Sequence, residues 1–333
     1  MTCALESGYT LSVMNNFWQT LKKPLFVLAP MADVTDVAFR SVIAKYGKPD
    51  VMWTEFVAAD GLYATREKVG MKDEDNPLMQ SLLFNKEESP IVAQLFSSNE
   101  ENMEYAAKLC SELGFDGIDI NMGCPDRSIE KQGAGAAHMK DLETAKKVIQ
   151  AAKKSGLPVS VKTRIGYNKE EIDAWIPELL SQDLACLTVH LRTRKEMSKV
   201  AAHWELMPRI VALRDKLAPN TVLLGNGDVE SIEDGNKKVE ETGCDGVMVG
   251  RGIFGNPWFF SGKEVSKEEK LRVMLEHTRL YTELLPNKNF SIMRKHYKAY
   301  ANGFDGAAEL RAKLFETKSR EEVEKILVDE RLI

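Results

Sequence analysis

Short, nearly continuous apolar runs recur eight times between residues 25 and 252, and this recurrence limits the fold more than any other feature. Strands buried on both faces of a parallel sheet have this pattern. Eight of them, alternating with helical patterns, favour an α/β fold of the (β/α)8 (TIM) barrel type over an open doubly wound sheet. The predicted strands are Leu25–Pro30, Asp50–Glu55, Pro90–Phe96, Gly117–Gly123, Pro158–Arg164, Cys186–Arg192, Thr221–Gly227 and Gly246–Gly252.

Amphipathic patterns between the runs predict the helices of the barrel. These are Asn99–Leu113, Asp141–Lys154, Glu170–Gln182, Glu205–Leu217 and Ser231–Thr242. After Gly252 the alternation stops, and helical patterns without a strand follow at Lys267–Leu284, Asn289–Ala301, Gly306–Phe315 and Ser319–Val328. We therefore expect an extension over residues 1–16, the barrel over residues 17–262 and a small C-terminal all-helical domain over residues 263–333.

Composition excludes several classes of protein. The 333 residues are 44% hydrophobic and carry a net charge of −5, as in ordinary globular proteins. No apolar run approaches the roughly 18 residues that a membrane helix requires, and the N-terminal residues lack the pattern of a secretory signal. We expect a cytoplasmic protein, a monomer that does not associate with membranes.

The cysteines are Cys3, Cys110, Cys124, Cys186 and Cys244. Their odd number, wide spacing and lack of a CxxC pair argue against disulfides, a zinc site or an iron–sulfur cluster. We expect free thiols and no metal. Three of these cysteines fit the usual role of a small buried hydrophobic residue. Cys124 differs, because it follows a predicted strand directly and precedes a polar, glycine-rich loop.

Polar side chains gather at the C-terminal ends of six predicted strands, where barrel enzymes carry their chemistry. A single buried Gln or His is more often a satisfied core residue than a ligand, but repetition around one rim indicates an active site. The glycines Gly227 and Gly250 suit a phosphate site, to which Arg251 could add charge. Lys162 could pair with an acid or stabilise negative charge on a bound ring. The polar residues are Gln94, Asn121, Lys162, Arg164, His190, Arg192, Asn226, Asp228 and Arg251.

The segment Asn287–Lys298 contains Lys288, Arg294, Lys295 and Lys298 and no acidic residue. On charge alone, a solvated helix face is the better interpretation of such a segment.

Several strings at the rim resemble those of the tRNA-dihydrouridine synthase family, most closely its bacterial B-type branch. They are Asp119–Pro125 (DINMGCP) with Gly133–Ala136, Ala29–Asp36 (APMADVTD), Val161–Arg164, Asn226–Asp228 and Gly250–Gly252. The resemblance runs in order from about Phe17 to the C-terminus. It implies an FMN enzyme that reduces the C5=C6 bond of a uridine in tRNA with NADPH as reductant.

The resemblance also implies residue roles. Hydride would pass from flavin N5 to C6 of the uracil, and Cys124 would donate the proton to C5. A thiol with a pKa of about 8.5 is protonated at neutral pH, which suits that role. The target base has to leave the RNA stack to reach the pocket. Residues expected at FMN are Pro30, Met31, Gln94, Lys162, His190, Asn226, Gly227, Asp228, Gly250 and Arg251, and those expected at tRNA are Asn121, Arg164, Arg192, Lys288, Arg294, Lys295 and Lys298.

One stretch departs from the family pattern. In HLRTRKEMSKVAAHW, four positions differ from the family: Leu191, Ser198, Val200 and His203. His138 also stands where an aliphatic residue is usual. These changes lie near the sixth predicted strand, so they concern substrate positioning more than flavin binding.

Two alternative functions remain open. A flavin barrel could reduce a free pyrimidine, like dihydroorotate or dihydropyrimidine dehydrogenases, although this gives no reason for the basic helical tail. An RNA-binding protein on a barrel with a vestigial flavin site is the other alternative.

Overall fold

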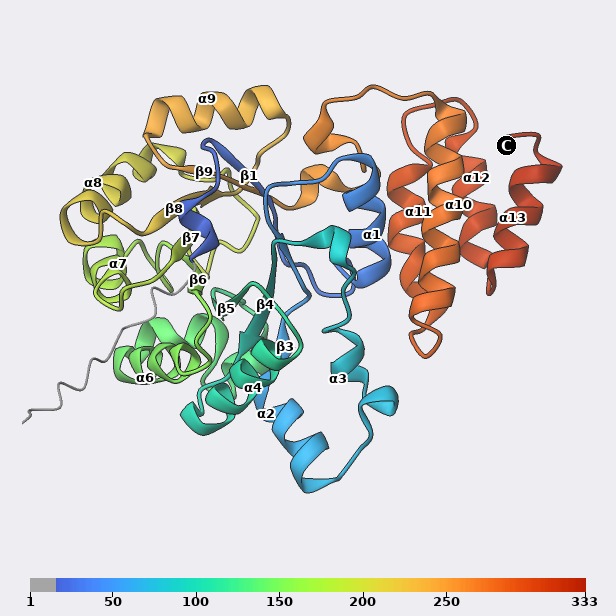
Figure 1. Ribbon diagram of the computed structural model, residues 1–333. Coiled ribbons are helices and arrows are strands. Elements are labelled where there is room, and N and C mark those ends of the chain that lie inside the picture. Colours follow the sequence, from blue (N-terminus) through green and yellow to red (C-terminus); the bar gives the residue numbers. More distant parts are fainter. Residues whose placement is uncertain (1–15) are drawn as a thin grey trace, which may run out of the picture.

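The eight predicted strands all form, and they close into a barrel of parallel strands (Figure 1). The computed structural model describes residues 16–333, so the predicted extension over residues 1–16 lies outside the described residues except for Asn16. Around the barrel the order is β1-β9-β8-β7-β6-β5-β4-β2. A bridge between Val27 and Val51 joins β1 to β2 and completes the circle. The barrel strands are β1 (Leu25–Leu28), β2 (Met52–Trp53), β4 (Ile91–Phe96), β5 (Gly117–Met122), β6 (Val159–Arg164), β7 (Cys186–His190), β8 (Val222–Asn226) and β9 (Gly246–Val249).

The second predicted strand is shorter than its apolar run. β2 stops at Trp53, and β3 (Val57–Ala58) then pairs with the end of β4. The interruption leaves Glu55 on the rim between the two short strands, where it accepts a hydrogen bond from the Asp33 amide.

The five predicted barrel helices all form. They are α4 (Glu100–Glu112), α6 (Leu142–Lys153), α7 (Ile172–Leu180), α8 (Met207–Leu217) and α9 (Ile232–Thr242). Asn99, Asp141 and Ser231 each accept a backbone N–H of the first turn. α7 contains Pro177 and is shorter than predicted at both ends. α8 is preceded by a 3-10 turn, Trp204–Leu206, where a regular helix was expected.

Helix α1 (Val37–Tyr46) was not predicted, because most of its residues are apolar and buried and its polar face is narrow. Phe39 and Ile43 pack in the barrel core, whereas Val37, Ala38 and Val42 pack against the C-terminal helices. A helix buried on two sides gives no amphipathic pattern. The short helices α2 (Ala59–Tyr63), α3 (Pro77–Gln80) and α5 (Arg127–Glu130) were also not predicted.

The C-terminal segment folds as four helices beside α1 (Figure 1). They are α10 (Lys267–Leu284), α11 (Met293–Tyr300), α12 (Ala307–Glu316) and α13 (Arg320–Asp329). A 3-10 turn, Phe290–Ile292, occupies the start of the predicted helix Asn289–Ala301. Within residues 16–333, no helix combines the length and the apolar content needed to cross a membrane.

Candidate active site

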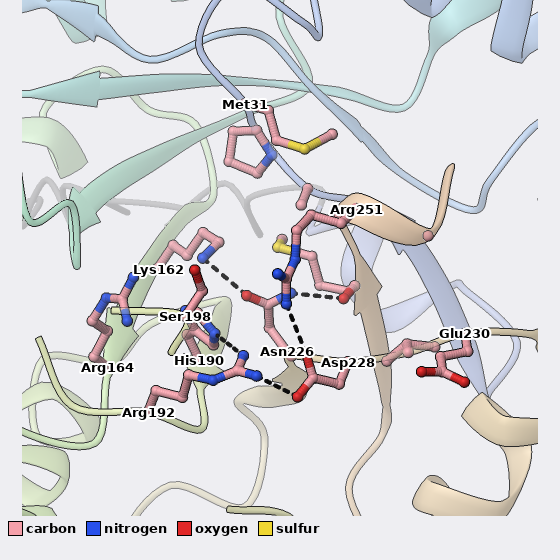
Figure 2. A pocket seen from close by; sticks show the side chains of 17 residues that line it. Met31, Lys162, Arg164, His190, Arg192, Ser198, Asn226, Asp228, Glu230 and Arg251 are labelled. Carbon is pink, nitrogen blue, oxygen red and sulfur yellow. Dashed lines mark hydrogen bonds and ion pairs between the residues drawn. The ribbon is translucent and has the colours of Figure 1, made fainter. Parts of the chain in front are cut away.

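A cavity of about 650 Å³ opens at the C-terminal ends of the barrel strands (Figure 2). Its wall brings together most residues that the resemblance assigns to FMN and two that it assigns to tRNA. Those residues are Pro30, Met31, Lys162, Arg164, His190, Arg192, Asn226, Gly227, Asp228, Gly250 and Arg251. The cavity is also lined by Val229, Glu230 and Met248, which were not predicted from the sequence.

Lys162 lies on the inner wall of the cavity, next to Asn226. Its Nζ donates to Asn226 Oδ1 at 3.2 Å, and Asn226 Nδ2 donates to the Met248 carbonyl at 2.8 Å. Burial, together with the charge of the nearby Arg164 guanidinium, lowers the pKa of Lys162 to about 8. Lys162 therefore remains mostly cationic at neutral pH and faces the cavity with a weakly held proton.

His190 is a neutral imidazole in this site. Burial, together with the charges of Arg164 and Lys162, holds its pKa well below the usual value. Arg192 Nη1 lies 3.0 Å from His190 Nε2. Because a guanidinium only donates, Nε2 accepts and the ring proton sits on Nδ1.

The Arg192 side chain is almost fully buried and already has several partners. Its Nε donates to the Val200 carbonyl at 2.7 Å, and its Nη2 pairs with Asp228. Asp228 also accepts the Ala202 amide. Arg192 thus joins the end of β8 to residues 198–202, which belong to the stretch that differs from the family pattern.

The far end of the cavity combines positive charge with free backbone donors. Although partial burial opposes ionisation, hydrogen bonds from Arg192 and Ala202 keep the pKa of Asp228 below its usual value. Asp228 in turn accepts from Arg251, whose side chain is 65% exposed. Among the described residues, the amides of Asp228, Arg251 and Gly252 have no protein acceptor. A phosphate could accept from such donors.

Gly227 is required at this end by its conformation. Its φ is 126°, a value that side chains rarely adopt, and an added Cβ would lie 2.8 Å from Ala202 Cβ. A residue other than glycine would displace the loop that closes this side of the cavity.

Cys124 lies on the turn after β5 and does not line the cavity itself. It is half-buried at the edge of an apolar cluster of Phe96, Ile129 and Ala134. Burial raises the pKa of the thiol, so it is protonated at neutral pH. Arg164, which does line the cavity, donates from Nε to the Gly123 carbonyl at 2.7 Å. The Cys124 turn is therefore joined to the cavity wall.

Gln94 and Asn121 lie beside this turn. Gln94 is fully buried, and Asn121 is 7% exposed. Asn121 Oδ1 accepts the amides of Gly123 and Cys124 at 3.1 and 2.9 Å. Asn121 therefore helps to position Cys124. Asp119, which was not predicted as a site residue, contacts Gln94; a carboxylate inside an apolar strand was the available signal.

The four basic residues of the tail differ in their surroundings. Lys288 Nζ lies 2.7 Å from Glu55 Oε2 and is 16% exposed. Lys295 Nζ lies 3.8 Å from Asp33 Oδ2. Arg294 and Lys298 are exposed and have no ion-pair partner among residues 16–333. Only the latter two are free to meet a ligand without breaking an ion pair.

The positions that depart from the family pattern fall into different environments. Leu191 is buried, Ser198 lines the cavity and Val200 is exposed. His203 lies between Glu196 and Glu205, with ring nitrogens 3.2 and 3.1 Å from their carboxylates. His138 is fully buried, and its Nε2 lies 3.1 Å from the Ser97 carbonyl.

Comparison with known proteins gives consistent results. The family model described as dihydrouridine synthase (Dus) matches residues 27–333. A Bacillus subtilis (strain 168) protein named probable tRNA-dihydrouridine synthase 2 is 44% identical over 319 residues, covering 94% of this chain and 96% of its own. A Staphylococcus epidermidis (strain RP62A) probable tRNA-dihydrouridine synthase is 42% identical over 317 residues, covering 94% and 95%.

Among solved structures, a 2-naphthoyl-CoA reductase in complex with 2-naphthoyl-CoA has a TM-score of 0.53 at 9% identity. The match covers 71% of this chain and 49% of the reductase, and it supports the fold alone. The family model and the two bacterial relatives each span nearly the whole described chain. The protein therefore belongs to the dihydrouridine synthase family of enzymes.

Proposed function

We propose that this protein is a tRNA-dihydrouridine synthase that reduces the C5=C6 bond of a uridine in tRNA. Its cofactor is FMN, its reductant is NADPH, and it acts as a cytoplasmic monomer without a metal. The observation that carries the proposal is the position of Cys124. A protonated thiol lies on a turn that Arg164 joins to a cation-lined cavity at the barrel rim.

The residues of the cavity fit FMN. Pro30 and Met31 offer an apolar wall to a flat ring, and Lys162 offers a cation beside it. At the other end, Arg251 and the free amides near Gly227 suit a phosphate. A bound flavin supplies the hydride for the reduction, which is chemistry that no side chain of the chain can perform.

The chain's own residues would handle charge and protons. Negative charge develops on the uracil as hydride arrives, and the cations Lys162 and Arg164 favour that charge. The neutral His190 can donate a hydrogen bond from Nδ1. Cys124 gives its proton to C5, and its raised pKa keeps that proton available.

The helical domain would hold the RNA around the flipped base. Arg294 and Lys298 are free for phosphate contacts. The contacts predicted for Lys288 and Lys295 stay predictions, because each ion pair with the barrel would first have to open.

Replacement of the thiol tests this function. Cys124→Ala is expected to retain the yellow flavin and to lower uridine reduction by about 10²–10⁴-fold. Dihydrouridine would be measured by mass spectrometry in tRNA from a deletion strain that carries either Cys124→Ala or a control variant. Cys110→Ala, at a buried cysteine in α4, is the matched control and should restore the modification. Undiminished turnover by Cys124→Ala would refute the acid role.

A further inference from the structure

A chain of buried hydrogen bonds links Asp119 to the turn that carries Cys124. Asp119 lies between Gln94 of β4 and Ser160 of β6 in the strand register. Gln94 Nε2 donates to Asp119 Oδ2 at 2.6 Å, and Ser160 Oγ donates to Asp119 Oδ1 at 2.6 Å. Asn121 Nδ2 then donates to Gln94 Oε1 at 3.0 Å. The chain ends where Asn121 Oδ1 accepts the amides of Gly123 and Cys124.

Both ends of this chain have a fixed hydrogen-bond polarity. A carboxylate at Asp119 only accepts, and the backbone amides of Gly123 and Cys124 only donate. Gln94 and Asn121 each carry one donor end and one acceptor end. Only one orientation of both amides satisfies every contact, so Asp119 at one end and the turn amides at the other together fix which atom Asn121 presents to the turn.

Reversal of the chain would disturb Cys124 directly. Asn121 would then present an NH₂ group to two N–H donors, and buried polar groups without acceptors are costly. The turn has little room to move, because the Cys124 carbonyl already accepts the Ala136 amide at 3.0 Å. Gly135 also packs tightly against the turn, because a Cβ added at residue 135 would lie 2.9 Å from the Cys124 carbonyl oxygen.

We propose that Asp119 is a positioning residue, which acts through Gln94 and Asn121 to set the place of the Cys124 thiol. The part of this role that concerns catalysis rests on the proposed function. The geometric part does not, and thiol reactivity in the free protein measures it independently.

Two substitutions at Asp119 separate hydrogen bonding from charge and shape. Asp119→Leu has nearly the same shape but no acceptor. Asp119→Asn loses the charge but keeps an oxygen for Gln94 while its NH₂ faces Ser160. The rate at which iodoacetamide alkylates Cys124 is measured by mass spectrometry of the peptide that contains this residue. We expect Asp119→Leu to change this rate several-fold. We expect Asp119→Asn to restore the wild-type rate.

Steady-state kinetics give the second readout. A displaced acid affects the proton-transfer step, so Asp119→Leu should lower kcat by about 10²-fold and leave KM for tRNA nearly unchanged. Ser160→Ala is the matched control, because it removes the other partner of Asp119 and leaves the chain to Cys124 intact. It should match the wild type in both readouts.

Gln94→Met provides a further test should Asp119→Leu not fold. It breaks the same chain one residue later, and it should change the alkylation rate in the same direction. Combined with Asp119→Leu, it should add little, as expected for residues that act in series. Unchanged alkylation in Gln94→Met or Asp119→Leu, or an Asp119→Asn variant as altered as Asp119→Leu, would overturn the proposal. If alkylation changes but no variant, nor the wild type, reduces tRNA uridine, the positioning holds and the proposed function fails.

Discussion

At the scale of single residues, Asp36 shows how a useful contact can carry an electrostatic cost. Its Oδ1 caps α1 by accepting the Phe39 amide at 3.0 Å. Its Oδ2 is buried without a hydrogen-bond partner among the described residues, and Lys288 Nζ lies 3.9 Å away. Burial raises the pKa of Asp36 to about 6, although Lys288 acts against this. The carboxyl group of Asp36 thus binds a proton more tightly in the folded protein than in the unfolded chain.

The sign of the pH dependence follows from that pKa. The contribution of Asp36 to stability is present below about pH 4 and is lost as the pH rises through about 6. Asp36→Asn keeps the cap and does not titrate. From pH 4 to 7, its unfolding free energy relative to the wild type should therefore rise by about 1–3 kcal/mol. Urea unfolding at several pH values measures this difference, and a difference independent of pH would contradict the expectation.

Asp141 is a matched control for this experiment. It also caps a helix, but hydrogen bonds from Thr144 hold the pKa of its exposed carboxyl below the usual value. The ionised form of Asp141 stabilises the fold. The unfolding free energy of Asp141→Asn should therefore fall relative to that of the wild type as the pH rises. As the pH rises, the unfolding free energies of the two variants relative to the wild type should change in opposite directions.

At the scale of elements, an ion-pair seam joins the barrel rim to the helical domain. Glu55, between β2 and β3, pairs with Lys288, which follows α10. Asp33, on the loop after β1, lies near Lys295 of α11. Glu55 also accepts the Asp33 amide, so the seam contacts the loop that contains Pro30 and Met31. Part of the basic tail therefore supports the fold of the cavity wall.

Lys288→Met and Lys298→Met should behave differently. Loss of one phosphate contact lowers the slope of log affinity against log salt by about one, and we expect this for the exposed Lys298. Lys288→Met should leave the slope unchanged and destabilise the fold by about 1–3 kcal/mol, because Glu55 loses a partner. Filter binding of tRNA and thermal unfolding measure the two effects. A reduced slope for Lys288→Met would show that its ion pair opens to RNA.

Some helices and contacts could be predicted from the sequence and others could not. α4, α6 and α9 have one face in solvent, so their amphipathic patterns were readable. α1 was not, because it is covered on both sides. Likewise, the sequence identified Arg192 and Lys288 as cations but not their partners, since Asp228 and Glu55 come from distant segments of the chain.

At the scale of the whole molecule, the barrel and the helical domain share one apolar interface. Val37, Ala38 and Val42 of α1 pack in a single cluster with Trp258 and with the cores of α10 and α11. A chain that ends at residue 262 would expose this surface to water. We expect the full chain to unfold in one cooperative transition in calorimetry and the shortened chain to aggregate. Two separate transitions for the full chain would contradict this expectation.

Removal of the helical domain is therefore a poor way to decide between tRNA and a free pyrimidine as substrate. A full-length variant with Arg294→Ser and Lys298→Ser is better, because both side chains are exposed and unpaired in residues 16–333. A tRNA enzyme should lose about tenfold in kcat/KM for tRNA, from two lost phosphate contacts, and should not turn over uracil or orotate. Equal turnover of a free pyrimidine by the wild type and the double variant would favour the flavin barrel that acts on small substrates, since uracil and orotate carry no phosphate for these two cations to bind.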